Sequence, residues 1–154
     1  AYAGALAILL SIRLAQNARQ NFIPQVIRLL PESETKNRLT EISKNPNISL
    51  RQLLLHREQG DHAAESVPIA LLAAQKSASA GIRSVWKEMV SASRDGAVLC
   101  SIAGQIAGSF LSETDLPEEW MQRIRNSDSY IEFEGIAKTY QDFVLQHKGV
   151  RSLF

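Results

Sequence analysis

Apolar side chains recur along this chain with the three-to-four-residue period of an α-helix. The clearest example is a broad apolar stripe made by Ile82, Val85, Trp86, Met89 and Val90. The same spacing occurs over residues 67–74 and again over residues 133–144. No segment alternates apolar and polar residues as a half-buried β-strand does. Because each stripe must be buried against another helix, the pattern predicts an all-α fold.

Capping signals mark several helix starts. Ser49 and Gln52 have the spacing of a capping box, in which each side chain bonds the other residue's backbone N–H. Asp115 and Glu118 have the same spacing, and Pro117 would lie in the first turn, where its missing N–H costs nothing. We therefore expect one helix to begin near residue 50 and another near residue 116.

Prolines mark further boundaries. Pro31 is expected to end the helix that includes residues 26–30. Pro68 has two interpretations: it lies in a first turn capped by Ser66, or it kinks a longer helix. The polar segment 32–44 is expected to be an exposed helix. Together these signals predict a compact multi-helix domain of about eight helices, with residues 1–154 in a single domain.

Composition and charge exclude some classes of partner. The 154 residues have a formal charge of +1, and the basic residues are scattered, so no nucleic-acid partner is expected. The N-terminal apolar run ends at Arg13, too early to span a bilayer, so no membrane partner is expected either. The one cysteine, Cys100, suits a buried thiol in a reducing compartment and predicts a cytoplasmic protein. Because the chain begins within an apolar run without Met, we expect a fragment or a processed product.

Most catalytic signatures are missing from the sequence. It has no glycine-rich phosphate loop, and the histidines His56, His62 and His147 are too dispersed to suggest a metal site. Gly104 and Gly108 are four residues apart on an apolar segment. Since glycine is costly within a helix, this pair predicts a tight helix crossing in the core.

Three motifs in order form a more specific pattern. They are Glu-Ser-Val-Pro-x-Ala-Leu over residues 65–71, Ile-Ala-Gly-Gln-Ile-Ala-Gly over 102–108, and Leu-Pro-Glu-Glu-Trp over 116–120. Their order and spacing resemble the C-terminal half of the ADP-ribosylglycohydrolase family, most clearly over residues 60–124. The resemblance implies an all-α fold. It also implies an activity that removes ADP-ribose from modified side chains or related compounds with two Mg²⁺ or Mn²⁺ ions.

The resemblance also locates where this sequence departs from the family. The family's Gly-Gly-Asp-x-Asp-Thr metal loop aligns with residues 93–98, where only Asp95 is retained. Ala97 and Val98 offer no side-chain oxygen to a hard cation, and Arg94 places a positive charge beside Asp95. The family's other ligand segment, Thr-Asp-Asp, occurs nowhere in the 154 residues. Asp95 is therefore interpreted as a helix start rather than a metal ligand. No cofactor is expected, and Mg²⁺ only if the site is partly retained.

Three functions follow as hypotheses. The first is a non-catalytic binding or structural module that has lost the di-magnesium site. The second is a fragment of an active ADP-ribosyl hydrolase whose N-terminal half is absent. The third is a helical interaction domain unrelated to ADP-ribose, docking a protein through its apolar tail (Val150, Leu153 and Phe154). ADP-ribose is a possible ligand, its phosphate held near Arg94 and Gly96 at a helix start. Self-association would follow if the apolar first helix lacks cover.

Overall fold

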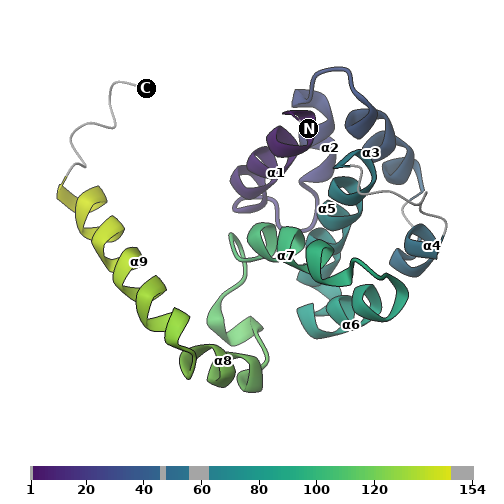
Figure 1. The fold of residues 1–154 in the computed structure, drawn as a ribbon. Helices are drawn as coiled ribbons and strands as arrows, with labels where there is room; N and C mark the ends of the chain where they lie inside the picture. Colours follow the sequence, from purple (N-terminus) through teal and green to yellow (C-terminus); the bar gives the residue numbers. More distant parts are fainter. Residues whose placement is uncertain (1, 46–47, 56–62, 147–154) are drawn as a thin grey trace. The chain divides into compact units, whose positions relative to one another are not determined.

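The structure, a computed structural model, describes residues 2–45, 48–55 and 63–146. Over these residues the chain is all-α, which confirms the expected fold class (Figure 1). The helices are α1 (Tyr2–Ala15), α2 (Ile23–Leu29), α3 (Glu34–Lys44), α4 (Leu50–Leu55), α5 (Ala63–Ala80), α6 (Ile82–Ala92), α7 (Gly96–Ala107), the 3₁₀ helix η1 (Glu113–Asp115), α8 (Glu118–Arg125) and α9 (Asp128–Gln146). They fall into two compact units, Ala1–Leu116 and Pro117–Phe154.

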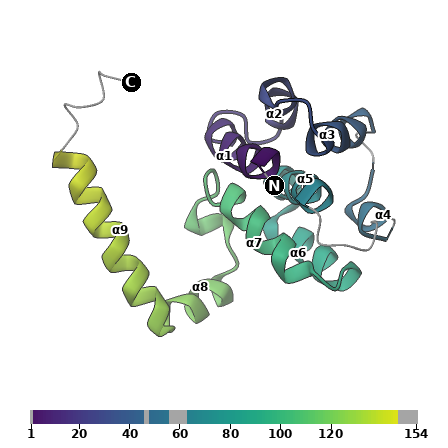
Figure 2. The same cartoon turned by 45° about the horizontal axis from the view of Figure 1, so that its top comes forward.

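Helix α5 is the centre of the first unit. It contacts α1, α2, α3, α4, α6 and α7, and every residue from Ser66 to Ala74 is buried (Figure 2). Such all-round burial explains why this helix is apolar on every side rather than on one stripe. The hydrophobic core of the unit therefore surrounds α5, and the other helices each turn one apolar face toward it.

Pro68 lies inside α5, five residues after the helix begins at Ala63. This decides between the two interpretations that the sequence left open, in favour of the longer helix. A proline within a helix costs about 3 kcal/mol, because its ring displaces a neighbouring carbonyl and its N–H is missing. Pro68 is fully buried. Its packing among the surrounding helices offsets that cost.

Helix α1 has two different apolar faces. The face toward the core is built from small residues, Gly4, Ala7, Ser11 and Ala15, all buried. A β-carbon added at Gly4 would lie 3.3 Å from the side chains of both Ala63 and Val67, so this position brings α1 close to α5. On the other face Tyr2 is 77% exposed and Leu9 is 64% exposed. The first helix thus has the uncovered apolar surface that the sequence suggested.

The caps confirm one expected boundary and correct another. Gln52 donates its backbone N–H to the Ser49 hydroxyl at 3.1 Å, and Ser49 donates its N–H to the Gln52 side chain at 3.1 Å. The capping box ahead of α4 is thus confirmed. The expected pairing of Asp115 with Glu118 is wrong, because Asp115 caps η1 instead. Its carboxylate accepts the backbone N–H and the hydroxyl of Ser112, each at 2.8 Å. These bonds lower the pKa of Asp115.

The boundary at Pro31 and the helix in the polar segment 32–44 both agree with the expectation. Helix α2 ends at Leu29, and Leu30 has an extended backbone directly before Pro31. Helix α3 forms within the polar segment 32–44, and it buries only Thr35, Leu39 and Ile42. Among the described helices, none is long and apolar enough to cross a membrane.

The second unit contains the helices α8 and α9. The apolar positions of residues 133–144 form one helix, α9, as predicted, but α9 has no buried residue. Phe133, Ile136 and Tyr140 are each more than 60% exposed. The expectation that this stripe is buried against another helix stays a prediction. The single-domain expectation for residues 1–154 stays a prediction.

Some positions singled out in the sequence lie outside the described residues. These are the three histidines, His56, His62 and His147, and the apolar tail residues Val150, Leu153 and Phe154.

Candidate functional site

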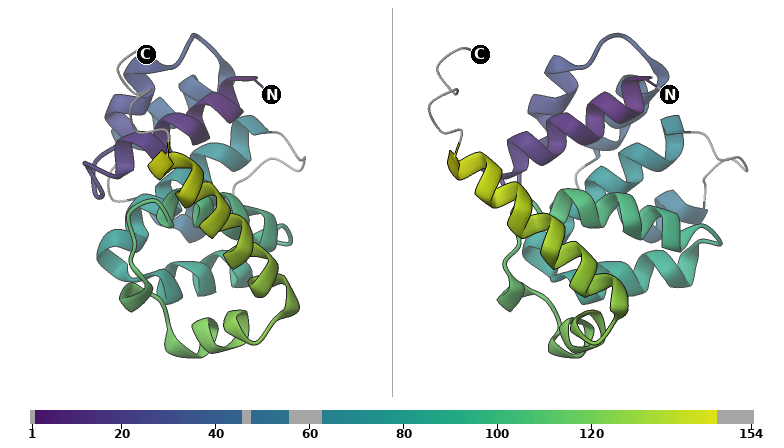
Figure 3. Two further views of the ribbon diagram at one scale, coloured as in Figure 1. Left: turned by 90° about the vertical axis from the view of Figure 1, so that its left-hand side faces the viewer. Right: turned by 60° about the vertical axis from the view of Figure 1, so that its left-hand side comes forward.

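The candidate site is the connection between α6 and α7, two helices that run side by side (Figure 3). Helix α6 ends at Ala92, and Ser93 adopts an extended backbone while its N–H donates to the Met89 carbonyl at 3.1 Å. The Ser93 hydroxyl then accepts the Asp95 N–H at 3.2 Å. Asp95 is the residue before α7, and its carbonyl accepts the Leu99 N–H at 3.1 Å. The connection is a tight turn that starts α7 at Asp95, as the sequence predicted.

Gly96 makes this turn possible by its lack of a side chain. It is buried, and a β-carbon placed on it would lie 2.7 Å from the Val90 α-carbon and 3.0 Å from the Met89 carbonyl oxygen. Both atoms belong to the backbone of α6, so neither can move aside cheaply. The Gly96 N–H donates to the Ser93 carbonyl at 3.3 Å. Gly96 therefore allows α6 and α7 to approach closely at this turn, a role that the sequence did not reveal.

The other glycines of α7 have looser surroundings than expected. A β-carbon at Gly104 would meet only the Trp86 ring, at an ordinary contact distance of 3.7 Å. Gly108 is exposed and follows the last residue of α7, and a β-carbon there would approach only the preceding turn, with the Gly104 carbonyl oxygen at 3.1 Å, and no other helix. The predicted tight crossing at Gly104 and Gly108 is therefore wrong. The small residues of α7 that are fully buried are Ala103 and Ala107.

Comparison with known protein families identifies the family of this chain. The family model described as ADP-ribosylglycohydrolase matches residues 1–149, nearly the whole chain. The chain belongs to the ADP-ribosylglycohydrolase family. No curated protein and no solved structure matches it. The resemblance seen in the three motifs is thus confirmed, and the match extends well beyond residues 60–124.

The resemblance to the ADP-ribosylglycohydrolase family places one ligand segment of a two-metal site at residues 93–98, the α6–α7 connection, and the side chains there do not fit such a segment. Arg94 is exposed, Asp95 is half-buried, and Ala97 and Val98 are exposed positions whose side chains contain only carbon. Mg²⁺ requires oxygen ligands, and Asp95 is the one carboxylate of the turn. Over the part of the chain that the structure describes, no three His, Cys, Asp or Glu side chains gather where they could hold a metal ion.

Cys100 lies on α7, one turn after Gly96. The side chain is half-buried, and burial raises the pKa of its thiol. A thiol with a raised pKa stays protonated near neutral pH and is a poor nucleophile. Cys100 therefore fits a packing role in the first unit better than the role of a nucleophile.

A cavity of about 220 Å³ lies elsewhere in the first unit. It is lined by Asn21, Ile23, Pro24, Ile42, Ser43, Asn45, Leu72, Gln75 and Lys76. Two of its polar groups bond the chain itself: the Gln75 side-chain oxygen accepts the Ile23 N–H at 3.3 Å, and Lys76 donates to the Ile48 carbonyl at 2.8 Å. These bonds link α5 to the segments around α2 and α4, so they contribute to the fold.

Proposed function

We propose that this chain is a non-catalytic binding or structural module of the ADP-ribosylglycohydrolase family that has lost the di-magnesium site. One observation carries the proposal: the positions of the family's metal loop are Ser-Arg-Asp-Gly-Ala-Val over residues 93–98. Two ligand positions hold Ala97 and Val98, which cannot bind a hard cation through their side chains. Arg94 adds a positive charge next to the remaining Asp95.

The shape of the connection supports the same conclusion. Gly96 is pressed against the backbone of α6, and its N–H bonds the Ser93 carbonyl. A turn that is fixed by packing in this way has a structural reason to keep its form without a metal ion. Asp95 in turn has a structural role as the residue that precedes α7, near the positive end of the helix dipole.

The alternative function is a fragment of an active ADP-ribosyl hydrolase. For this alternative, additional sequence would have to supply the Thr-Asp-Asp ligands and also compensate for Ala97 and Val98. No residue from another segment restores an oxygen at those two positions of the turn, so we rank this alternative second. A helical interaction domain unrelated to ADP-ribose ranks third, because the family match spans residues 1–149.

Calorimetric titration with ADP-ribose tests the proposal directly. We expect the same result in Mg²⁺ and in excess chelator, because binding does not depend on a metal ion. A parallel assay with an ADP-ribosylated protein should detect no release of ADP-ribose. Tight binding that disappears in chelator, or Mg²⁺-dependent release of ADP-ribose, would overturn the proposal in favour of the hydrolase.

Metal-free binding of ADP-ribose would point to Arg94 as the phosphate ligand. Its guanidinium is exposed at the start of α7, where the helix dipole also favours an anion. If ADP-ribose binds in chelator, Arg94→Ala should weaken binding, whereas Arg28→Ala, another exposed arginine, should not. Unchanged affinity in the Arg94 variant would exclude this position of the ligand.

The proposed module acts through a protein partner or through self-association. The uncovered face of α1, with Tyr2 and Leu9 largely exposed, supports this part of the proposal. We also propose a cytoplasmic location, where reducing conditions keep a lone thiol such as Cys100 free.

A further inference from the structure

The cavity of about 220 Å³ in the first unit, here called the α5 cavity, lies where three helices meet. Its lining residues come from the start of α2, the end of α3 and the second half of α5, helices that contact one another (Figure 2). All of these residues belong to the unit Ala1–Leu116, so the cavity is a feature of that unit alone. It shares no residue with the α6–α7 connection. The α5 cavity is therefore a separate place for a ligand, independent of the proposed function.

The base of the α5 cavity is apolar. Ile23 and Ile42 are each 3% exposed, and Leu72 is 9% exposed. The exposed residues of the lining form its rim, and most of them are polar: Asn21, Pro24, Ser43 and Asn45. An apolar base with a few polar groups around it is the usual composition of a small-molecule site. A ligand of this cavity therefore needs an apolar body.

Two neighbouring polar side chains of α5 have hydrogen-bond donors to spare. Lys76 has three N–H groups and donates one of them to the Ile48 carbonyl at 2.8 Å. The side-chain oxygen of Gln75 accepts the Ile23 N–H at 3.3 Å, which leaves the NH₂ group of that amide. Within the described residues, neither side chain makes a further hydrogen bond or ion pair. A ligand in the cavity therefore meets two donors that need an acceptor.

The charge of the lining favours an anion as that acceptor. Among the described residues that line the cavity, Lys76 is the one ionisable group, and it is half-buried. Partial burial makes its attraction to an anion stronger than the same attraction in bulk water. The end of α3 adds only a partial negative charge, about half a unit, so the full charge of Lys76 dominates. A carboxylate has two oxygens, enough to accept hydrogen bonds from Lys76 and Gln75 together.

We propose that the α5 cavity binds a small organic carboxylate with an apolar ring or branched chain. An apolar cavity of about 150 Å³ admits benzene, so a cavity of about 220 Å³ has room for a ring and one carboxylate. In the complex the apolar body lies on Ile23, Ile42 and Leu72. The carboxylate accepts hydrogen bonds from Lys76 and Gln75.

Titration of the full chain with benzoate, followed by the NMR shifts of backbone amides, tests the proposal. We expect saturable shifts at Ile23, Ile42 and Gln75, with a dissociation constant of roughly 0.1–5 mM for so small a molecule. Benzamide has the same ring without the charge and should bind at least about fivefold more weakly. Absence of saturable shifts up to about 20 mM benzoate, shifts confined to residues outside the cavity, or equal binding of the two compounds would overturn the proposal.

A matched pair of lysine substitutions tests the charge. Lys76→Gln should weaken benzoate binding at least about fivefold and leave benzamide binding within about twofold. Lys44→Gln removes the same charge from the exposed end of α3, at a residue that does not line the cavity. It should leave both affinities nearly unchanged, because salt screens exposed charges. No loss in the Lys76 variant, or an equal loss in the two variants, would contradict the proposed ligand.

Ser43→Phe gives a second measurement that keeps the bond between Lys76 and Ile48. Ser43 is exposed at the rim, so a larger side chain there fills the mouth of the cavity and leaves the buried core unchanged. This variant should lose binding of both benzoate and benzamide, with circular dichroism confirming its helix content. Unchanged benzoate affinity in this variant would place the ligand elsewhere and overturn the proposal. Arg94→Ala should leave benzoate binding intact, so the ADP-ribose position and the α5 cavity are tested separately.

Discussion

At the scale of single residues, alanine substitutions at Gly96 and Gly104 compare a glycine that touches the backbone of another helix with one that does not. Gly96→Ala would place a β-carbon 2.7 Å from the α-carbon of Val90, so α6 and α7 must separate. We expect a loss of about 1–3 kcal/mol in the free energy of unfolding, the usual cost of overpacking. Urea denaturation followed by circular dichroism measures this loss.

The control for that substitution is Gly104→Ala. The added methyl group would meet only Trp86, at 3.7 Å, and alanine is favoured over glycine within a helix by up to about 1 kcal/mol. Gly104→Ala should therefore be neutral or stabilising. Equal losses in the two variants would contradict the close contact assigned to Gly96.

The glycines also show what a local pattern leaves undecided. The sequence favoured Gly104 and Gly108 as the close contact because they are spaced by four residues on an apolar helix. The close contacts with another helix are at Gly4 and Gly96 instead, where a β-carbon would lie 3.3 Å or less from an atom of α5 or α6. Spacing identifies residues on one face of a helix, but only the path of the neighbouring backbone decides which of them must be small.

At the scale of elements, helix α4 is held by a cap from a distant helix. The Arg51 N–H at its start donates to the carboxylate of Glu88 on α6 at 2.8 Å, in addition to the local capping box. Glu88→Ala should destabilise the chain by about 0.5–2 kcal/mol, as loss of an N-cap acceptor does. It should also accelerate hydrogen exchange of the Arg51 amide.

Glu88→Gln serves as the control, because it keeps an oxygen acceptor while removing the charge. Protection of the Arg51 amide should be largely retained in this variant. If both variants exchange at the same rate as the parent, the contact between Glu88 and α4 does not hold this helix start.

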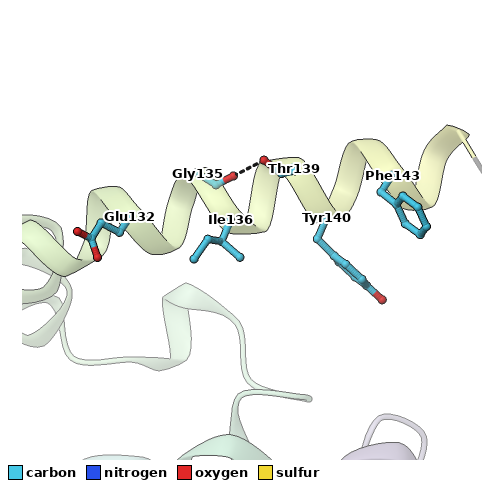
Figure 4. A pocket seen from close by; sticks show the side chains of 6 residues that line it. All are labelled: Glu132, Gly135, Ile136, Thr139, Tyr140 and Phe143. Atoms are coloured by element: carbon cyan, nitrogen blue, oxygen red, sulfur yellow. Dashed lines mark hydrogen bonds between the residues drawn. The ribbon is translucent and has the colours of Figure 1, made fainter.

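Helices α5 and α9 show how far periodicity predicts an element. Both helices were expected from the sequence, and both are present. The sequence left the position of Pro68 within α5 open, because the cost of a buried proline is offset only by neighbours that come from distant segments. For α9, shown in Figure 4, the period of the apolar residues predicted the helix correctly, and its burial stays a prediction. Periodicity identifies an apolar face and does not identify what covers it.

At the scale of the whole molecule, the hydrophobic core lies in one unit. Every member of the core cluster falls between Ala7 and Phe110, and Met121 is the one buried hydrophobic residue among the described positions after Leu116. A chain of residues 1–116 should therefore unfold cooperatively, with a denaturant midpoint close to that of the full chain. Residues 117–154 alone should lack stable tertiary structure, since the described part of this segment, residues 117–146, has Met121 as its one buried hydrophobic residue.

This measurement also tests the single-domain prediction. A large fall in the midpoint of the shortened chain would mean that both units unfold as one cooperative domain. Independent folding of residues 117–154 would instead mean that the chain contains two domains.

The sequence by itself determined the helical class, the helix boundaries at Ser49 and Pro31, and the family motifs. These features depend on side-chain chemistry and on periods of a few residues, which are local properties. Tertiary structure decided the rest: that α5 is central, that Pro68 lies within α5, and that Gly96 meets the backbone of α6. Each of these depends on which distant segments approach one another, because burial and close contact arise from pairs of elements and not from one.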